Sequence, residues 1–317
     1  MRKSFVALVA ALVAVVFAAG QAQAQQYINI LTGGTGGVYY PLGVALANVY
    51  AKYIPNSQPT AQATKGSVEN LQKVSKGEGE LAFTLGDSLS FAWNGNADVG
   101  FPKPLKNLRG VAVTYSNYIQ ILASKDSGIK TLADLKGKRL SVGAPKSGTE
   151  LNTRAVLAAA GLTYNDLGKV EYLDFNQSVE LIKNRQLDAT LQSVGLGNSA
   201  LRDLANSVDI VVVPIPADIA SKIPDKAYAQ VIIPANTYKG QTTDVPSVAV
   251  ANVLVTNESL STDLVYQMTK LLFEHLDSLI AAHAAAKDIK LANALNGMPI
   301  PLHPGAEKYY KEKGLIK

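Results

Sequence analysis

Apolar residues recur along the chain in two alternating patterns. Short apolar runs, such as 81–85 and 210–213, are typical of buried strands. Spacings of three, four and seven residues, as at Leu264, Met268 and Leu271, are typical of a helix with one buried face. Strands that alternate with helices predict a layered α/β structure with a largely parallel sheet. We expect strands at 27–31, 60–64, 81–85, 108–114, 119–124, 140–143, 170–174, 188–192, 210–213 and 248–255, and helices at 40–53, 67 onward, 88–93, 150–160, 178–184, 198–205 and 262–286.

This alternation runs in two blocks. It restarts at the strand 140–143, and the strand 248–255 with the helix 262–286 resembles a return to the first block. The pattern predicts two lobes: lobe I from 25–117 and 246–317, and lobe II from 118–245. Each lobe is expected to be a mixed, largely parallel sheet flanked by helices. Ligands of such folds bind where helix N-termini converge, so we expect the site in the cleft between the lobes.

The first 24 residues have the pattern of a secretory signal peptide. A basic start at Arg2 and Lys3 precedes the apolar run 5–19, and Ala22-Gln23-Ala24 is a small-x-small cleavage signature. The apolar run is shorter than the roughly 20 residues of a membrane-spanning helix, which makes a retained anchor the lesser alternative. We expect cleavage after Ala24 and a periplasmic protein.

Composition excludes several classes of function. The chain has no cysteine, so disulfides, thiolate catalysis, thiolate metal sites and a lipidated N-terminal cysteine are excluded. Loss of Arg2 and Lys3 with the signal peptide lowers the formal charge from +5 to +3, a mild excess, and Lys136, Lys138 and Lys183 are scattered rather than clustered. We therefore expect no binding of nucleic acid.

The catalytic motifs that we sought are missing. The sequence has no Gly-x-Ser-x-Gly elbow, His-Glu-x-x-His motif or P-loop. His275 and His283 are eight residues apart, too far for a metal pair on one helix, and His303 lies in a turn-rich stretch. In the glycine-rich loop, Tyr39 stands where a dinucleotide site needs its third glycine. The prediction is a protein that is not an enzyme and carries no cofactor and no metal.

The residues that remain are suited to recognition of an anion. The loop 32–43 has four glycines in five positions, followed by a helix whose first N–H groups are free to bind. Such a helix N-terminus favours a carboxylate or phosphate. Tyr39 and Tyr40 at the mouth of the loop offer a hydroxyl and an aromatic wall, although one of the two is expected in the core. The loop residues taken as ligand-binding are Thr35, Gly36, Gly37, Tyr39 and Tyr40.

Three further segments after strands offer polar groups to the cleft. Ser67 either caps a helix or donates its hydroxyl to the ligand. Asp87 and Ser88 either cap a helix or meet an ammonium group of the ligand. A second anion seat is expected at Ser147, Gly148 and Thr149, again with helix capping as the alternative. Arg154 is expected at the surface rather than on a carboxylate.

Five blocks of the sequence resemble the solute-binding proteins of TRAP transporters, in the TAXI branch. These blocks are 33–43 (GGTGGVYYPLG), 66–70 (GSVEN), 126–139 (DSGIKTLADLKGKR), 143–149 (GAPKSGT) and 303–314 (HPGAEKYYKEKG). The resemblance implies a type II periplasmic binding protein fold. It also implies capture of glutamate, a dicarboxylate or a similar organic acid, and delivery to a TRAP-type membrane permease.

The sequence departs from this family near the expected cleft. Many relatives have a glutamine where this chain has Thr84-Leu85-Gly86, and a Gly-x-Pro where it has Gly195-Leu196-Gly197. Gly195 is nevertheless taken as a ligand-binding residue by position. Because both departures fall near the cleft, the identity of the solute is not transferred from the relatives.

The function expected from the sequence is a monomeric periplasmic receptor for a small carboxylate. One alternative is the binding protein of an ABC importer on the same fold. Two further alternatives are a ligand-sensing subunit and a periplasmic enzyme, and the latter lacks a nucleophile and base.

Overall fold

Two long antiparallel strands run through the whole molecule, β4 (Leu108–Ser124) and β10 (Val245–Asn257). The computed structural model describes residues 25–317, so the expected signal peptide lies outside the described residues. The segments 108–114 and 119–124, expected as two strands, are one strand. The polar residues between them continue the ladder, with Ser116 opposite Ala251.

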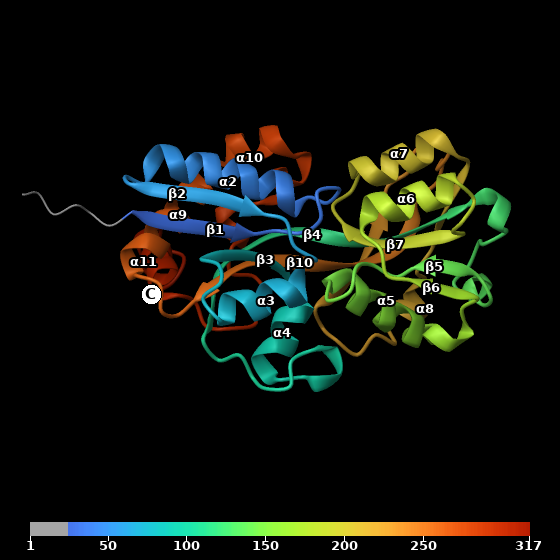
Figure 1. Cartoon of the computed structure of the whole chain (residues 1–317), viewed down its shortest axis with the longest axis horizontal. Coiled ribbons are helices and arrows are strands. Elements are labelled where there is room, and N and C mark those ends of the chain that lie inside the picture. Colours follow the sequence, from blue (N-terminus) through green and yellow to red (C-terminus); the bar gives the residue numbers. More distant parts are fainter. Residues whose placement is uncertain (1–24) are drawn as a thin grey trace, which may run out of the picture.

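Lobe I is built on one side of these strands from β1 (Gln26–Leu31), β2 (Ser57–Gln62) and β3 (Leu81–Leu85). β1 is parallel to both β2 and β3, and β3 pairs antiparallel with β10. Successive residues of a strand point to opposite faces, and in β1 Ile30 joins one hydrophobic cluster while Leu31 joins another. Helices therefore cover both faces (Figure 1). They are α2 (Tyr39–Tyr53), α9 (Thr262–Glu274), α10 (Leu276–Ala282) and α11 (Pro304–Glu312) with the first cluster, and α3 (Ser67–Ser75) and α4 (Gly86–Asn94) with the second.

Lobe II is built on the other half of the same two strands (Figure 1). Its strands are β5 (Arg139–Ser141), β6 (Lys169–Glu171), β7 (Ala189–Val194), β8 (Ile210–Val213) and β9 (Tyr228–Ile233). β7 and β8 pair with β4, β9 pairs with β10, and β5 is parallel to β6 and β7. Its helices are α5 (Gly148–Ala159), α6 (Phe175–Lys183), α7 (Ser199–Ser207) and α8 (Ala217–Ala220). The mixed α/β fold with a cleft between two lobes agrees with the prediction.

Short 3-10 helices connect several elements. They lie at Ala97–Val99, Lys125–Ser127, Ala133–Leu135, Tyr164–Asp166, Ala284–Asp288 and Leu291–Asn293. No helix of residues 25–317 has both the length and the apolar character that crossing a membrane requires.

Two helix predictions are corrected. The helix expected over 262–286 breaks at His275, whose ring stacks on Tyr53 with 4.2 Å between centroids. Ser67 is not an N-cap: the cap position is Gly66, at φ 107°, and the Ser67 hydroxyl accepts a hydrogen bond from the Leu85 N–H instead.

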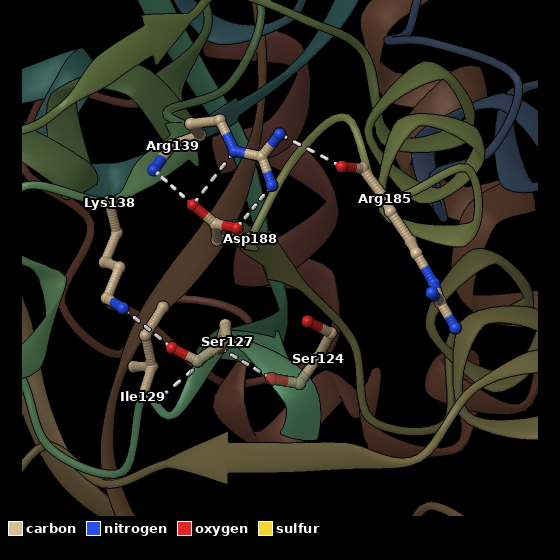
Figure 2. A network of polar contacts seen from close by, with 7 residues as sticks. All are labelled: Ser124, Ser127, Ile129, Lys138, Arg139, Arg185 and Asp188. Carbon is tan, nitrogen blue, oxygen red and sulfur yellow. Dashed lines mark hydrogen bonds and ion pairs between the residues drawn. The ribbon is translucent and has the colours of Figure 1, made fainter.

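The segment 126–139, one of the blocks that resemble known families, is fixed to lobe II by polar contacts (Figure 2). The Arg139 guanidinium donates to Asp188 through Nε at 3.1 Å and Nη2 at 2.6 Å. Lys138 donates to the Ser127 carbonyl at 2.7 Å. These contacts hold the connection between β4 and β5 against the start of β7, which is a structural role away from the cleft.

Candidate functional site

A cavity of about 350 Å³ lies between the two lobes, where four helices begin. α2 and α3 reach it from lobe I, and α5 and α6 reach it from lobe II. β4 and β7 complete the wall with Tyr115, Asn117, Ser193 and Val194. Each helix N-terminus presents N–H groups and the positive end of its dipole. The cavity therefore favours an anionic group.

The glycine-rich loop before α2 lies directly against lobe II. A Cβ at Gly36 would be 2.4 Å from Oδ1 of Asn176, so a side chain at this position would require the exposed Asn176 side chain to turn away. Asn198, which caps α7, donates to the Gly36 carbonyl at 2.8 Å. The glycines thus let the two lobes approach each other at the edge of the cavity.

Tyr39 forms part of the lobe I wall, and its hydroxyl is bonded within the protein. The ring stacks on Phe83 with 5.0 Å between centroids, and the hydroxyl donates to Oδ1 of Asn252 at 2.5 Å. Burial holds the pKa of Tyr39 well above its ordinary value. Asn252 in turn donates to Oδ1 of Asn117 at 3.0 Å. This chain of hydrogen bonds connects the lobe I wall to β4.

The N-terminus of α5 forms the facing wall. Oγ of Ser147 accepts from the Glu150 N–H at 3.1 Å, so the N–H groups of Gly148 and Thr149 remain for the cavity. A Cβ at Gly148 would lie 2.6 Å from Oγ of Ser67, so the lobes also touch here. Both candidate anion seats of the sequence therefore meet at one cavity.

Charged side chains contribute little to the lining. Among residues 25–317, Lys65 and Asp174 are the charged residues that line the cavity. Lys65 is exposed, and Asp174 is half-buried and caps α6 by accepting from the Gln177 N–H at 2.9 Å. Arg154 forms an ion pair with Glu150 at 2.6 Å and does not line the cavity. An anion in this cavity would therefore be held mainly by backbone N–H groups and helix dipoles.

Asp87 lies behind the cavity, in a buried contact between the lobes. Its Oδ2 accepts from Nδ2 of Asn152 at 2.7 Å and from the Tyr228 hydroxyl at 2.9 Å, and both partners belong to lobe II. Burial raises the pKa of Asp87 to about 6. Asn152 also accepts from the Ser193 hydroxyl at 2.5 Å, which links Asp87 to the wall of the cavity.

The family model described as the NMT1-like family matches residues 30–314, nearly the whole described chain. The chain belongs to the NMT1-like family.

Solved structures with the same fold include three bacterial proteins. One is a binding protein component of an ABC phosphonate transporter from Pseudomonas aeruginosa, with 12% identity, a TM-score of 0.53, and coverage of 84% of this chain and 80% of that one. A protein from Bordetella bronchiseptica has 16% identity, a TM-score of 0.51, and coverage of 91% and 98%. The ligand-binding component of an ABC-type import system from Staphylococcus aureus, with zinc bound, has 12% identity, a TM-score of 0.51, and coverage of 92% and 93%. At these identities the likeness shows the fold alone, that of a two-lobed periplasmic binding protein.

Most of the residues predicted from the sequence line the cavity of this NMT1-like chain. They are Gly36, Gly37, Tyr39, Ser67, Ser147, Gly148 and Thr149. Contact with a solute remains a prediction for each of them.

The structure places the other predicted residues outside the lining. Thr35 is exposed in the turn of the glycine-rich loop. Tyr40 is half-buried and follows Tyr39 around the helix, away from the cavity. Asp87 and Ser88 are fully buried, and the carboxylate that was expected to face an ammonium group accepts from the Ser88 N–H at 2.6 Å. Gly195 packs beneath the loop, where a Cβ would lie 3.1 Å from that of Ala285 and 3.4 Å from Cγ2 of Val38.

Several lining residues were not predicted from the sequence. Tyr172 lies between β6 and α6, and Phe175 is the first residue of α6. Tyr115, Asn117 and Ser193 come from β4 and β7. Tyr115 and Asn117 did have a signal in the sequence. They belong to a short polar and aromatic stretch between two apolar runs, near residue 117, where the chain was expected to pass from lobe I to lobe II. Nothing local distinguishes Tyr172 or Phe175.

The histidines have structural contacts away from the cavity. His303 caps α11 by accepting from the Gly305 N–H at 3.1 Å, and Nδ1 of His283 accepts from the Ala285 N–H at 3.1 Å. Within residues 25–317 no cluster of three or more His, Asp or Glu side chains is arranged to hold a metal ion.

Proposed function

We propose that this protein is the solute-binding component of a membrane importer and holds a small organic anion between its lobes. The observation that carries the proposal is the convergence of four helix N-termini, two from each lobe, on one cavity of about 350 Å³. That volume is within the range of small-molecule sites. The site needs both lobes to be complete, as expected of a receptor that closes on its ligand.

A carboxylate is the ligand class that we propose, such as a glutamate-like amino acid or a dicarboxylate. Sulfonates and phosphonates share the oxyanion chemistry that helix N-termini recognise. Hydrogen bonds to a charged group contribute about 1.5–3 kcal/mol each, and micromolar affinity corresponds to about −8 kcal/mol. Four or five such bonds reach that affinity without a buried arginine or lysine.

The class of importer is the second part of the proposal. Two of the structural neighbours are described as components of ABC transporters, which supports an ABC importer better than the TRAP permease expected from the TAXI-like blocks. The adjacent genes distinguish the two: an ATPase gene supports the ABC importer, and a permease gene with many membrane spans and no ATPase supports the TRAP system.

An extracytoplasmic location accompanies this proposal. The signal-peptide pattern and the periplasmic binding protein fold both support it. N-terminal sequencing of the exported protein tests the expected cleavage after Ala24, and a retained Met1 would contradict it.

A thermal-shift assay tests solute binding. The protein is unfolded and refolded to remove retained solute and then heated with succinate, L-glutamate, ethanesulfonate or ethylphosphonate. A ligand at 100 times its Kd stabilises the folded state by about 2.7 kcal/mol, which is a Tm increase of roughly 5 °C for a chain of this size. The proposal fails if no organic anion raises the Tm. Conversion of a bound anion to product would favour the enzyme alternative.

A further inference from the structure

Lobe II gives the cavity an apolar wall that solvent reaches. The apolar lining residues of this lobe that are exposed or half-buried are Ala144, Pro145, Tyr172 and Phe175. On lobe I, the apolar lining residues Val38 and Leu85 are 2% exposed and Tyr39 is 9% exposed, so little of their surface is open to a solute. A solute that enters between the lobes therefore finds its accessible carbon surface on lobe II.

Contacts with the glycine-rich loop fix the position of Phe175, the first residue of α6. A Cβ at Gly37 would be 3.6 Å from Cε2 of the Phe175 ring, and a Cβ at Gly34 would be 3.7 Å from Cβ of Asp174. Both glycines line the cavity. The ring of Phe175 therefore lies at the boundary between the cavity and the loop, where the two lobes meet.

Tyr172 lies beside the second anion seat. Its ring meets that of Tyr164 edge-on, with 6.2 Å between centroids, and the Tyr164 hydroxyl donates to Oε1 of Glu150 at 2.8 Å. Glu150 belongs to the first turn of α5, the helix whose N–H groups at Gly148 and Thr149 face the cavity. Tyr172 nevertheless keeps 46% of its surface exposed. A group attached to an anion at this seat can therefore reach its ring.

The charge of this wall disfavours a second carboxylate. Asp174 lies between Tyr172 and Phe175 in the chain and also lines the cavity, whereas Lys65, the other charged lining residue, belongs to lobe I. A second carboxylate packed against lobe II would meet a like charge. An apolar group there would instead bury its surface against two aromatic rings.

We propose that Phe175 and Tyr172 bind the carbon body of the solute, which is therefore a carboxylate with an apolar, ring-sized body and no second charge. This inference rests on the proposed function and narrows its substrate class. Among the carboxylates it places arylalkyl and alicyclic acids ahead of dicarboxylates and glutamate-like amino acids.

The test compares Tyr172→Ser with Tyr53→Ser. Tyr53 is a matched control, because it is 43% exposed and its ring also contacts an aromatic neighbour, His275, but it does not line the cavity. Phenylacetate and cyclohexylacetate supply an apolar body, succinate and L-glutamate supply a second charged group, and acetate supplies the anion alone. Titration calorimetry at several temperatures, on protein freed of retained solute, gives the Kd and the heat-capacity change of binding for each probe.

The wild type is expected to bind phenylacetate or cyclohexylacetate at least about 10-fold more tightly than acetate, succinate or L-glutamate. Tyr172→Ser should raise the Kd of that apolar-bodied acid about 3- to 10-fold. It should also reduce the size of the negative heat-capacity change, because less apolar surface is buried on binding. Tyr53→Ser should leave both quantities unchanged.

Two results would overturn the inference and leave the proposed function intact. One is binding of acetate, succinate or L-glutamate as tight as that of both apolar-bodied acids. The other is a wild-type Kd in Tyr172→Ser, or an equal rise in Kd in Tyr53→Ser. No binding of any organic anion by the wild type would overturn both proposals.

Discussion

Gly148→Ala places a methyl group in the contact between the lobes. The added Cβ would lie 2.6 Å from both Cδ1 of Leu85 and Oγ of Ser67. Both neighbours belong to lobe I and are 2% exposed, so neither side chain can turn into solvent to make room. Since Gly148 is in lobe II, the clash is relieved when the lobes move apart. The variant is therefore expected to oppose closure without disturbing either hydrophobic core.

The size of the effect follows from the cost of overpacking. An extra methyl group in a packed contact costs about 1–3 kcal/mol, and each 1.4 kcal/mol is a tenfold change in an equilibrium constant. If this free energy opposes closure of the lobes on the solute, the Kd of the bound anion rises about 5- to 150-fold. The free energy of unfolding of the unliganded protein should change by less than about 0.5 kcal/mol, because the lobes of the unliganded protein relieve the clash by moving apart.

Titration calorimetry and urea unfolding of the same preparations measure the two quantities. Ser199→Ala is the control: Ser199 holds the first position of α7, as Gly148 does in α5, but Ser199 is exposed whereas Gly148 is buried. The control should bind and unfold like the wild type. Wild-type affinity in Gly148→Ala would refute the reasoning, as would a loss of stability as large as the loss of binding energy.

Three other variants test separate parts of the site. Burial raises the pKa of Asp87 from 3.8 to about 6, so the folded protein binds a proton more readily than the unfolded chain. Protonation of Asp87 therefore adds about 3 kcal/mol to the free energy of unfolding; this contribution is present in full below about pH 4 and is lost as the pH rises through about 6. Asp87→Asn should remove this pH dependence. A variant whose free energy of unfolding in urea changes with pH as that of the wild type does would contradict the prediction. Asn198→Ser keeps a capping hydroxyl for α7 but loses the bond to the Gly36 carbonyl, so Kd should rise about 2- to 10-fold at unchanged Tm; a lower Tm with wild-type Kd would count against it. Asn252→Ala removes the acceptor of the Tyr39 hydroxyl and the donor to the Tyr115 carbonyl and to Asn117, and should lower the free energy of unfolding by about 2–4 kcal/mol in urea; a loss below about 1 kcal/mol would argue against this network.

The sequence predicted the strands and helices that are marked by a pattern of neighbouring residues. β3 and β8 have the bounds expected from their uninterrupted apolar runs. The middle of β4 was missed because Tyr115 to Tyr118 is polar and aromatic, and its place in the sheet depends on pairing with β10. The break at His275 was missed because the apolar spacing continues beyond it. That break coincides with a contact to Tyr53, more than two hundred residues away in the chain.

The residues of the site also fall into two groups, those with a local signal in the sequence and those placed by distant contacts. The glycine-rich loop and the segment from Ser147 to Thr149 have recognisable helix-start chemistry, and the structure brings both to the cavity. Asp87 follows a strand and was expected to face the ligand, but its partners lie 65 and 141 residues away in α5 and β9. Short-range patterns carry no information about such contacts. The bulge at Thr114 and Tyr115 likewise becomes visible only when the two long strands are paired.

A crystal structure of the protein isolated with its solute from its own periplasm tests the central claim most directly. We predict electron density for one small anion in the cavity between the lobes, with anionic oxygens against the N–H groups of Gly148 and Thr149. A solute held elsewhere on the molecule, or one whose anionic group points away from the helix N-termini, would contradict the account.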